Sequence, residues 1–439
     1  MWQPPTGKRG ESRRRRPPPQ EFAARGDKST VGYGARTKTG AALRIHWTAL
    51  VFSSVNSAVQ LLVPLYALHL GYPGLTIGIL AALPSVANIS LRVVAGRLSD
   101  RHGETRVLQA GGLFYLTATL GFLLSTAAGL APFVCAQILQ GVGRSVFWTV
   151  GQAYVTKLPL ERGQHLSLFN GATNLGMLLG MSGAGLLVVS LGYPGAFATV
   201  FLLTLLYSAL TYSLPPLPAP ARPAPAGRAA GGWATPTLSL GPLWLAASCS
   251  FVSGGTFALA GSFYPVYLAQ VGYGARSIGL LVTLLAAGML GISFVARSLI
   301  DRAIPLGRLG VTFIISGGLG LAAVPIFHNW LPLAALLLVA GFCSGGCSLV
   351  YQLAVLRHSA WHTRGATMAS VGVFGNLALL ILPTTIGLAL RWTSLEAALA
   401  AAGLFIMILG GIAGLNVGRT NPLAAVRETI PVEGSAEGT

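Results

Sequence analysis

The chain has 439 residues, of which 53% are hydrophobic and only 9% are charged, and its formal net charge is +18. A soluble domain carries about a quarter charged residues, so this composition excludes a water-soluble globule. Because the few charges cluster between long apolar runs, the sequence indicates an integral membrane protein.

Residues 1–43 form a basic segment rich in Pro and Gly, and positions 1–44 hold eleven of the 29 Lys and Arg residues. Basic runs also occur in nucleic-acid-binding proteins, but no RNA- or DNA-binding motif follows this one, so we expect no nucleic-acid partner. We interpret the segment as a disordered cytoplasmic tail beside anionic lipid headgroups. A start codon assigned too early is an alternative origin for it.

Twelve apolar runs follow the tail, each close to the ~20 residues that a helix needs to cross the hydrocarbon core. Helices are the expected structure, because backbone polar groups in lipid must be satisfied within their own segment. The predicted spans are 44–70, 74–96, 107–128, 132–156, 165–190, 194–214, 242–270, 276–297, 309–327, 331–356, 366–390 and 394–417.

A Pro-, Ala- and Gly-rich stretch divides these spans into two sets of six. It predicts a flexible cytoplasmic linker over residues 215–241. The predicted domains are therefore a six-helix bundle over 44–214, a second bundle over 242–417 and a cytoplasmic tail over 418–439.

The distribution of positive charge predicts the orientation in the membrane. With the N-terminus inside, cytoplasmic segments hold 25 of the 29 Lys and Arg residues, whereas outside loops hold two, Arg276 and Arg391. An odd number of spans would spoil this alternation. We therefore expect a multi-pass protein of the cytoplasmic (inner) membrane with both termini in the cytoplasm.

The two sets of six spans repeat one another in sequence. Landmarks of the first set recur in the second at a constant offset, which predicts a parallel duplication of a six-helix unit. The positions matched at an offset of 201 include Pro64 and Pro265, Gly71 and Gly272, and Asp100 and Asp301.

The loop between the second and third spans carries the most specific motif. Residues 96–106 read GRLSDRHGETR, and a degenerate copy, RSLIDR, stands at residues 297–302. The loop resembles the signature G-x-L-[AS]-D-R-x-G-x-x-[RK] of the major facilitator superfamily, and with twelve spans and the duplication this resemblance covers residues 44–417. It implies an all-α membrane fold of twelve helices in two six-helix pseudo-repeats, which transports solutes by alternating access.

In that family the signature loop latches the cytoplasmic side while the cavity faces outward. The resemblance implies that Asp100 reaches the start of the eleventh span, where Arg364 is the nearest candidate cation. The alternative interpretation of the loop is an inert turn with ordinary helix capping. For Arg92, the alternative is a side chain that extends to the lipid interface. The predicted cytoplasmic gate comprises Arg92, Gly96, Asp100, Arg101, Gly103, Arg106, Asp301, Arg302 and Arg364.

Arg144 is the charged residue that points to a solute site. It lies in the middle of the fourth span, where a lone Arg costs at least ~2.5 kcal/mol. Every Asp and Glu lies in a tail, in a loop or at the end of a span, so none is available inside a span to pair with it. It must therefore face water or the bundle interior. Gln137, Gln140, Trp148 and Gln152 follow the same helical face as Arg144.

We expect a central cavity lined by spans one, four, seven and ten. Hydrogen bonding between helices is the alternative role for its polar residues. The predicted cavity residues are Arg144, Gln137, Gln140, Trp148, Asn56, Gln60, Tyr264, Tyr267 and Asn376.

Two departures from the drug-antiporter pattern weaken the inference of proton antiport. The fourth span has Gln137 where those antiporters have Arg in the motif R-x-x-Q-G-x-G. Their fifth-span motif is also imperfect, which leaves a ridge of small residues suited to close helix packing. That ridge comprises Ala172, Gly176, Gly180 and Ala184.

The sequence therefore predicts a secondary transporter that moves a small organic solute. We expect efflux as its direction, exchange for protons as its coupling and a monomer as its oligomeric state. The alternatives are an importer or exchanger of an anionic or carboxylate metabolite, and a non-transporting receptor or scaffold. No nucleotide-binding loop is present. The spans offer no acid–base pair and no metal cluster, so we expect no enzyme, no cofactor and no metal site.

Overall fold

The computed structural model describes residues 28–158, 162–216, 240–301, 304–358 and 364–419, and every regular element within these ranges is a helix. The chain divides into two units, Met1–Gly40 and Ala41–Thr439. The helices below belong to the second unit except for the start of the first helix. Most of the predicted basic tail, the linker and the C-terminal tail lie outside the described residues.

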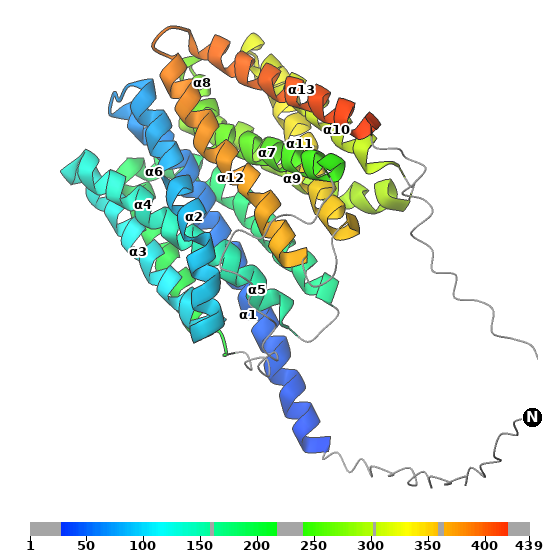
Figure 1. Cartoon of the computed structure of the whole chain (residues 1–439). Coiled ribbons are helices and arrows are strands. Elements are labelled where there is room, and N and C mark those ends of the chain that lie inside the picture. Colours follow the sequence, from blue (N-terminus) through cyan, green and yellow to red (C-terminus); the bar gives the residue numbers. More distant parts are fainter. Residues whose placement is uncertain (1–27, 159–161, 217–239, 302–303, 359–363, 420–439) are drawn as a thin grey trace, which may run out of the picture. The chain divides into compact units, whose positions relative to one another are not determined.

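The first half of the second unit contains the predicted spans one to six (Figure 1). The first helix begins at Lys28, well before the predicted start of its span, since extending a helix is less costly than nucleating one. The elements are α1 (Lys28–His69), α2 (Gly74–His102), α3 (Glu104–Ala128), α4 (Leu130–Val146), the π-helical turn η1 (Phe147–Gly151), α5 (Gln152–Thr156) and α6 (Arg162–Tyr212).

Helix α6 contains two of the predicted spans. Its apolar part, Leu168–Tyr212, has 45 residues, which at about 1.5 Å per residue is twice the thickness of the hydrocarbon core. The helix is broken at Gly192, whose φ of 67° and ψ of −179° are not helical, and Pro194 follows. The eleven apolar helices found in the described residues therefore provide twelve crossings, which confirms the predicted fold class.

The second half contains predicted spans seven to twelve, and its first span is interrupted after Ala260. Its elements are α7 (Leu240–Ala260), α8 (Phe263–Gln270), α9 (Ala275–Asp301), α10 (Leu306–Ala323), the 3-10 turn η2 (Val324–Ile326), α11 (Trp330–His358), α12 (Arg364–Ala389) and α13 (Leu395–Arg419).

The duplication read from the sequence recurs in the backbone. Gly71 and Gly272 both have positive φ, 72° and 99°, which a residue without a Cβ adopts at little cost. The Gly71 N–H donates to the Leu68 carbonyl at 2.9 Å, and the Gly272 N–H donates to the Ala269 carbonyl at 3.1 Å. The same turn therefore closes the first span of each half, at the same offset of 201.

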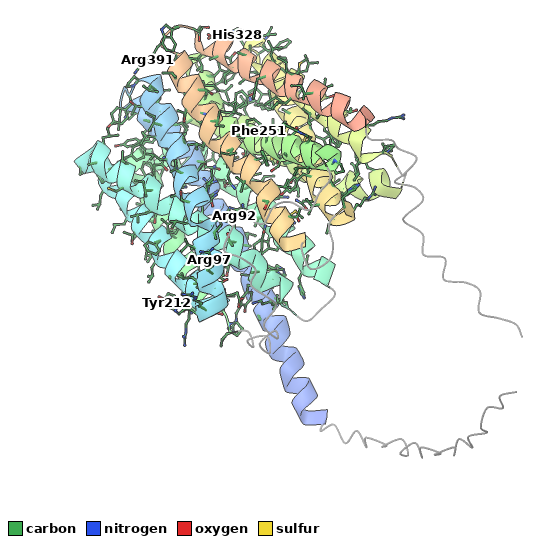
Figure 2. The ribbon with its side chains drawn as sticks, viewed as in Figure 1. Arg92, Arg97, Tyr212, Phe251, His328 and Arg391 are labelled. Atoms are coloured by element: carbon green, nitrogen blue, oxygen red, sulfur yellow. The ribbon has the colours of Figure 1, made fainter. Side chains whose placement is uncertain are left out.

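The halves meet chiefly along two seams, α2 against α12 and α6 against α9. Glycines bring the backbones together in both: a Cβ on Gly78 would lie 3.3 Å from the Gly387 Cα, and a Cβ on Gly185 would lie 3.1 Å from the Gly279 Cα. We call the end of the bundle that carries the turns at 70–73 and 390–394 the short-loop end. Arg391 and His328 lie toward it, and Arg97 and Tyr212 lie toward the opposite end (Figure 2).

Candidate functional site

A small pocket lies where α1, α2, α4, α7 and α12 converge, so both halves contribute to it. Most of its wall is apolar, and four polar side chains interrupt that wall. The lining residues are Val59, Gln60, Val63, Ala81, Pro84, Gln137, Gln140, Arg144, Ala258, Gly261, Leu379 and Pro383.

Helix α4 supplies three of the four polar side chains. Gln137, Gln140 and Arg144 are 2%, 1% and 4% exposed, and all three line the pocket. Their spacing of i, i+3 and i+7 places them on one face of the helix. The polar stripe expected from the sequence is thus brought together over this part of α4.

Three buried polar atoms on the pocket wall have no hydrogen-bond partner among the described residues. They are the Gln60 Oε1, the Gln137 Oε1 and the Arg144 Nε. Buried polar groups in proteins are almost always hydrogen-bonded. These three groups are therefore available to form hydrogen bonds with a polar solute or with water.

Gln140 differs from these groups because the protein itself satisfies it. Its Nε2 donates to the Tyr115 hydroxyl at 3.3 Å, and that hydroxyl donates to the Asn56 Oδ1 at 3.2 Å. The chain of bonds ties α4 to α3 and α1 behind the pocket wall. Tyr115 was missed at the level of sequence, because one tyrosine in an apolar run carries no distinguishing signal.

Arg144 is the one charged residue of the pocket lining, and no Asp or Glu from the described part of the chain lines it. The guanidinium is therefore a buried positive charge in an apolar surrounding. Because ionised groups are costly to bury without a partner, the charge favours an anionic ligand.

The predicted stripe does not continue to Trp148, which the structure does not bring to the pocket. The π-helical turn η1 begins at Phe147 and changes the number of residues per turn, so the regular spacing fails beyond Arg144. Trp148 instead lies edge-on to Phe52 and Phe147, with ring centroids 6.3 Å and 5.4 Å away.

Tyr264 and Tyr267 also lie away from the pocket. Both are fully buried. The Tyr264 hydroxyl donates to the Leu321 carbonyl at 3.4 Å, and the Tyr267 hydroxyl lies 3.2 Å from the Pro325 carbonyl. They therefore anchor α8 to α10 and η2. The second half contributes small and apolar residues of α7 and α12 to the pocket, and α11, the predicted tenth span, contributes none of the lining residues.

Asn376 takes part in a contact between the halves. The Asn88 Nδ2 on α2 donates to the Asn376 Oδ1 on α12 at 2.8 Å, and the Asn376 Nδ2 donates to the Gly372 carbonyl at 3.1 Å. One turn further along α2, the Arg92 guanidinium packs against Gly372, where a Cβ would lie 3.4 Å from Nη1 (Figure 2). Arg92 therefore faces α12 in this structure.

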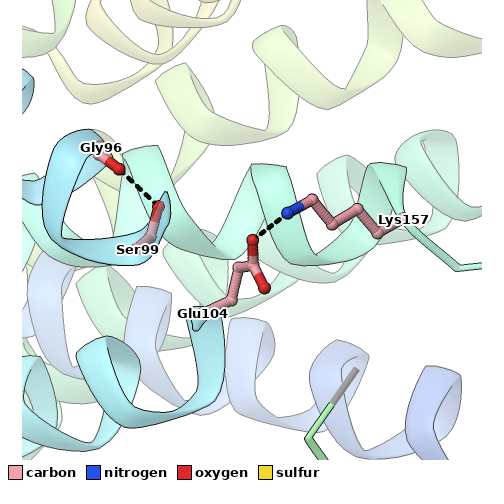
Figure 3. Close-up of polar contacts among 4 residues, drawn as sticks. All are labelled: Gly96, Ser99, Glu104 and Lys157. Atoms are coloured by element: carbon pink, nitrogen blue, oxygen red, sulfur yellow. Dashed lines mark hydrogen bonds and ion pairs between the residues drawn. The ribbon is translucent and has the colours of Figure 1, made fainter. Parts of the chain in front are cut away.

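The signature loop is a sharp turn between α2 and α3. Gly103, with a φ of 85°, ends α2 through a 2.9 Å bond from its N–H to the Ser99 carbonyl. The Ser99 hydroxyl donates to the Gly96 carbonyl at 2.8 Å, and buried Glu104 forms an ion pair with Lys157 at the end of α5 (Figure 3). The loop is thus fixed to its own half of the protein.

The remaining gate residues divide into two groups. Arg101 and Arg106 are exposed at the loop. Arg302 lies outside the described residues, and the side chains of Asp100, Asp301 and Arg364 also lie outside the described part. The expected contact from Asp100 to Arg364 therefore stays a prediction.

Known proteins resemble this chain in sequence and in fold. A model of the Major Facilitator Superfamily matches residues 45–383. An uncharacterized MFS-type transporter of Schizosaccharomyces pombe is 31% identical over 136 residues, which cover 30% of this chain and 30% of that protein. A similarly described protein of Methanocaldococcus jannaschii is 29% identical over 126 residues, which cover 28% of this chain and 32% of that protein.

The alignments thus span about a third of the length of these relatives. In three dimensions, the crystal structure of the POT family transporter PepTSo matches with a TM-score of 0.68 at 12% identity, covering 88% of this chain and 98% of that one. At that identity the match shows a common fold.

Proposed function

The chain belongs to the major facilitator superfamily, and from this premise we propose that it is a secondary transporter that moves a small, carboxylate-bearing solute, with Arg144 as the residue that binds the anion. The family is one of transporters, which confirms the expectation that the chain is not an enzyme. The observation that supports this proposal is the buried guanidinium of Arg144, whose Nε has no partner among the described residues, in a pocket built from both halves.

Arg144 supports an anionic solute on energetic grounds. An Arg at the centre of a membrane helix costs about 2.5–3.5 kcal/mol even by the mildest scale. A carboxylate would supply charge-assisted hydrogen bonds, which are about twice as strong as neutral ones. The bound solute would therefore offset part of the cost of burying the guanidinium.

Alternating access is the proposed mechanism. The pocket has walls from both halves, so movement of one half against the other about the α2–α12 and α6–α9 seams would expose it to each side in turn. We propose that the signature loop and Arg92 form the gate at the end opposite the short loops, and that this end is cytoplasmic, with the tails and the linker on the same side.

Export is the direction that we propose from the resemblance to efflux transporters, with exchange for protons as the coupling. Import or exchange of an anionic metabolite is the second candidate. It is favoured by Gln137, which stands where the drug antiporters have Arg. We place the protein in the cytoplasmic membrane as a monomer.

Binding and counterflow of a matched pair of probes test the proposal. The probes are 3-phenylpropionate and its amide, 3-phenylpropionamide, assayed by thermal stabilisation and by uptake into preloaded proteoliposomes. The carboxylate should stabilise the wild type and exchange, and the amide should do neither. Arg144→Gln should lower carboxylate affinity at least about tenfold, since one lost charge-assisted bond is worth about 1.5–3 kcal/mol.

Arg391→Gln is the control, because Arg391 is an exposed Arg in a turn at the short-loop end. It should leave binding and exchange unchanged. Equal binding of the acid and the amide, or unchanged exchange by Arg144→Gln, would reject Arg144 as the anion site.

A further inference from the structure

The pocket contains hydrogen-bond acceptors as well as a cation. The Gln137 side chain is 2% exposed, and its Oε1 has no partner among the described residues, as is also true of the Gln60 Oε1. An amide oxygen only accepts hydrogen bonds. A carboxylate carries no donor, so a solute that had nothing else would pair with Arg144 and leave both oxygens unpaired.

Gln60 reaches the second half of the protein. Its side chain packs against Gly261, at the break between α7 and α8, where a Cβ would lie 3.3–3.5 Å from the Gln60 Cβ, Cγ and Cδ. The Gly261 N–H is already bonded to the Phe257 carbonyl at 3.1 Å. The broken helix therefore supports the Gln60 side chain but gives it no hydrogen from the Gly261 amide.

Gln137 and Arg144 lie two turns apart on the same face of α4. Gln140 lies between them, and its amide already donates to the Tyr115 hydroxyl. The free acceptor and the free cation on α4 are thus separated along the pocket wall, and Gln60 adds an acceptor from α1. A single compact solute would have to present a carboxylate to one part of the wall and donors to another.

We propose that the transported solute is a small α-hydroxy or α-amino acid, whose carboxylate binds Arg144. Its hydroxyl donates to Gln137 or Gln60, whereas an ammonium group donates to both. This inference rests on the proposed function and adds the donor requirement to it. Gln60 and Gln137 are then the residues that determine specificity, because a simple acid leaves two buried acceptors unsatisfied.

The test compares two matched series of acids that differ only at the α carbon. The probes are propionate, lactate and alanine, and 3-phenylpropionate, 3-phenyllactate and phenylalanine, each titrated against the purified full-length protein by thermal stabilisation. In at least one series, the hydroxy or amino acid should bind at least about fivefold more tightly than the simple acid, because an unsatisfied buried acceptor costs about 1–3 kcal/mol.

Gln60→Met and Gln137→Met remove the acceptors while keeping the length of the side chain. Both should lower this ratio toward one, because the hydroxyl or ammonium group then loses its acceptor. Gln352→Met is the matched control, because Gln352 lies outside the pocket lining and its amide bonds to the Ser348 hydroxyl at 3.3 Å. It should leave the ratio as it is in the wild type.

The outcomes separate the two proposals. Equal affinity of the wild type for simple, hydroxy and amino acids would overturn the donor requirement while leaving an Arg144-dependent acid transporter standing. A ratio that survives in both Met variants would overturn the assignment to Gln60 and Gln137. A wild type that binds none of the six acids would overturn the inference and the proposed function together.

Discussion

Arg144 is the residue on which the functional account depends. Its place in the pocket could be predicted from the sequence, because a lone charge in a long apolar run must face water or protein. Its surroundings could not be predicted in the same way. Tyr115 and Gly261 come from other helices, and only the packing of those helices shows which side chains meet.

Substitution of Arg144 should abolish acid binding without lowering the unfolding temperature. Arg144→Met removes a buried charge that has no acidic partner in the pocket lining, and replacement of buried ions by apolar residues is often neutral or stabilising. We expect the unfolding temperature in detergent to stay the same or rise while acid binding is lost. A clear fall in unfolding temperature would mean that the guanidinium is held by bonds within the protein.

Among the helices, the membrane spans could be predicted from the sequence, but the π-helical turn η1 could not. The apolar runs predicted every span, and Gly192 with Pro194 marks the break between the fifth and sixth. The π-helical turn at Phe147 had no sequence signal. Because this turn changes the number of residues per turn, Trp148 lies off the stripe that one regular helical period predicts.

The bond between Asn88 and Asn376 joins two elements from different halves. Asn376 had been expected in the cavity, and its partner Asn88 was not anticipated because it lies 288 residues away. Hydrogen bonds between membrane helices average about 0.6 kcal/mol, with a maximum near 1.7. The bond thus links the two halves with an energy that alternating access can overcome.

A double-mutant cycle with Asn88→Leu and Asn376→Leu should measure this coupling. Each single substitution should lower the unfolding free energy by about 1 kcal/mol, because it leaves the other amide buried without its partner. The double substitution should cost less than the sum of the two. Strict additivity in chemical unfolding would contradict a direct bond between the two side chains.

At the scale of the whole molecule, the duplicated halves pack closely through glycines toward the short-loop end. The contacts of Gly78 with Gly387 and of Gly185 with Gly279 leave no space for a Cβ without movement of the neighbouring backbone. The duplication was predictable from the constant offset in the sequence. The seams were not, because glycines are common throughout the chain.

Bulky side chains in both seams should shift the protein toward a state that is open at the short-loop end. We expect Gly78→Leu with Gly279→Leu to lengthen the distance between spin labels at Leu70 and Trp392, both of which are exposed, in a background with the four native cysteines replaced. Gly183→Leu is the control, because a Cβ at Gly183 meets nothing within 4 Å. An unchanged distance in the double variant would mean that the seams do not hold that end closed.

The position of a bound acid in crystals of the protein tests whether Arg144 binds the carboxylate of the solute. A brominated probe, 3-(4-bromophenyl)lactate, can be located in crystals by the anomalous scattering of its bromine. We expect one molecule in the pocket between the halves, with its carboxylate at about 2.7–2.9 Å from the Arg144 guanidinium and its hydroxyl donating to Gln137 or Gln60. A probe bound elsewhere, or a pocket in which Arg144 stays without the carboxylate, would contradict it.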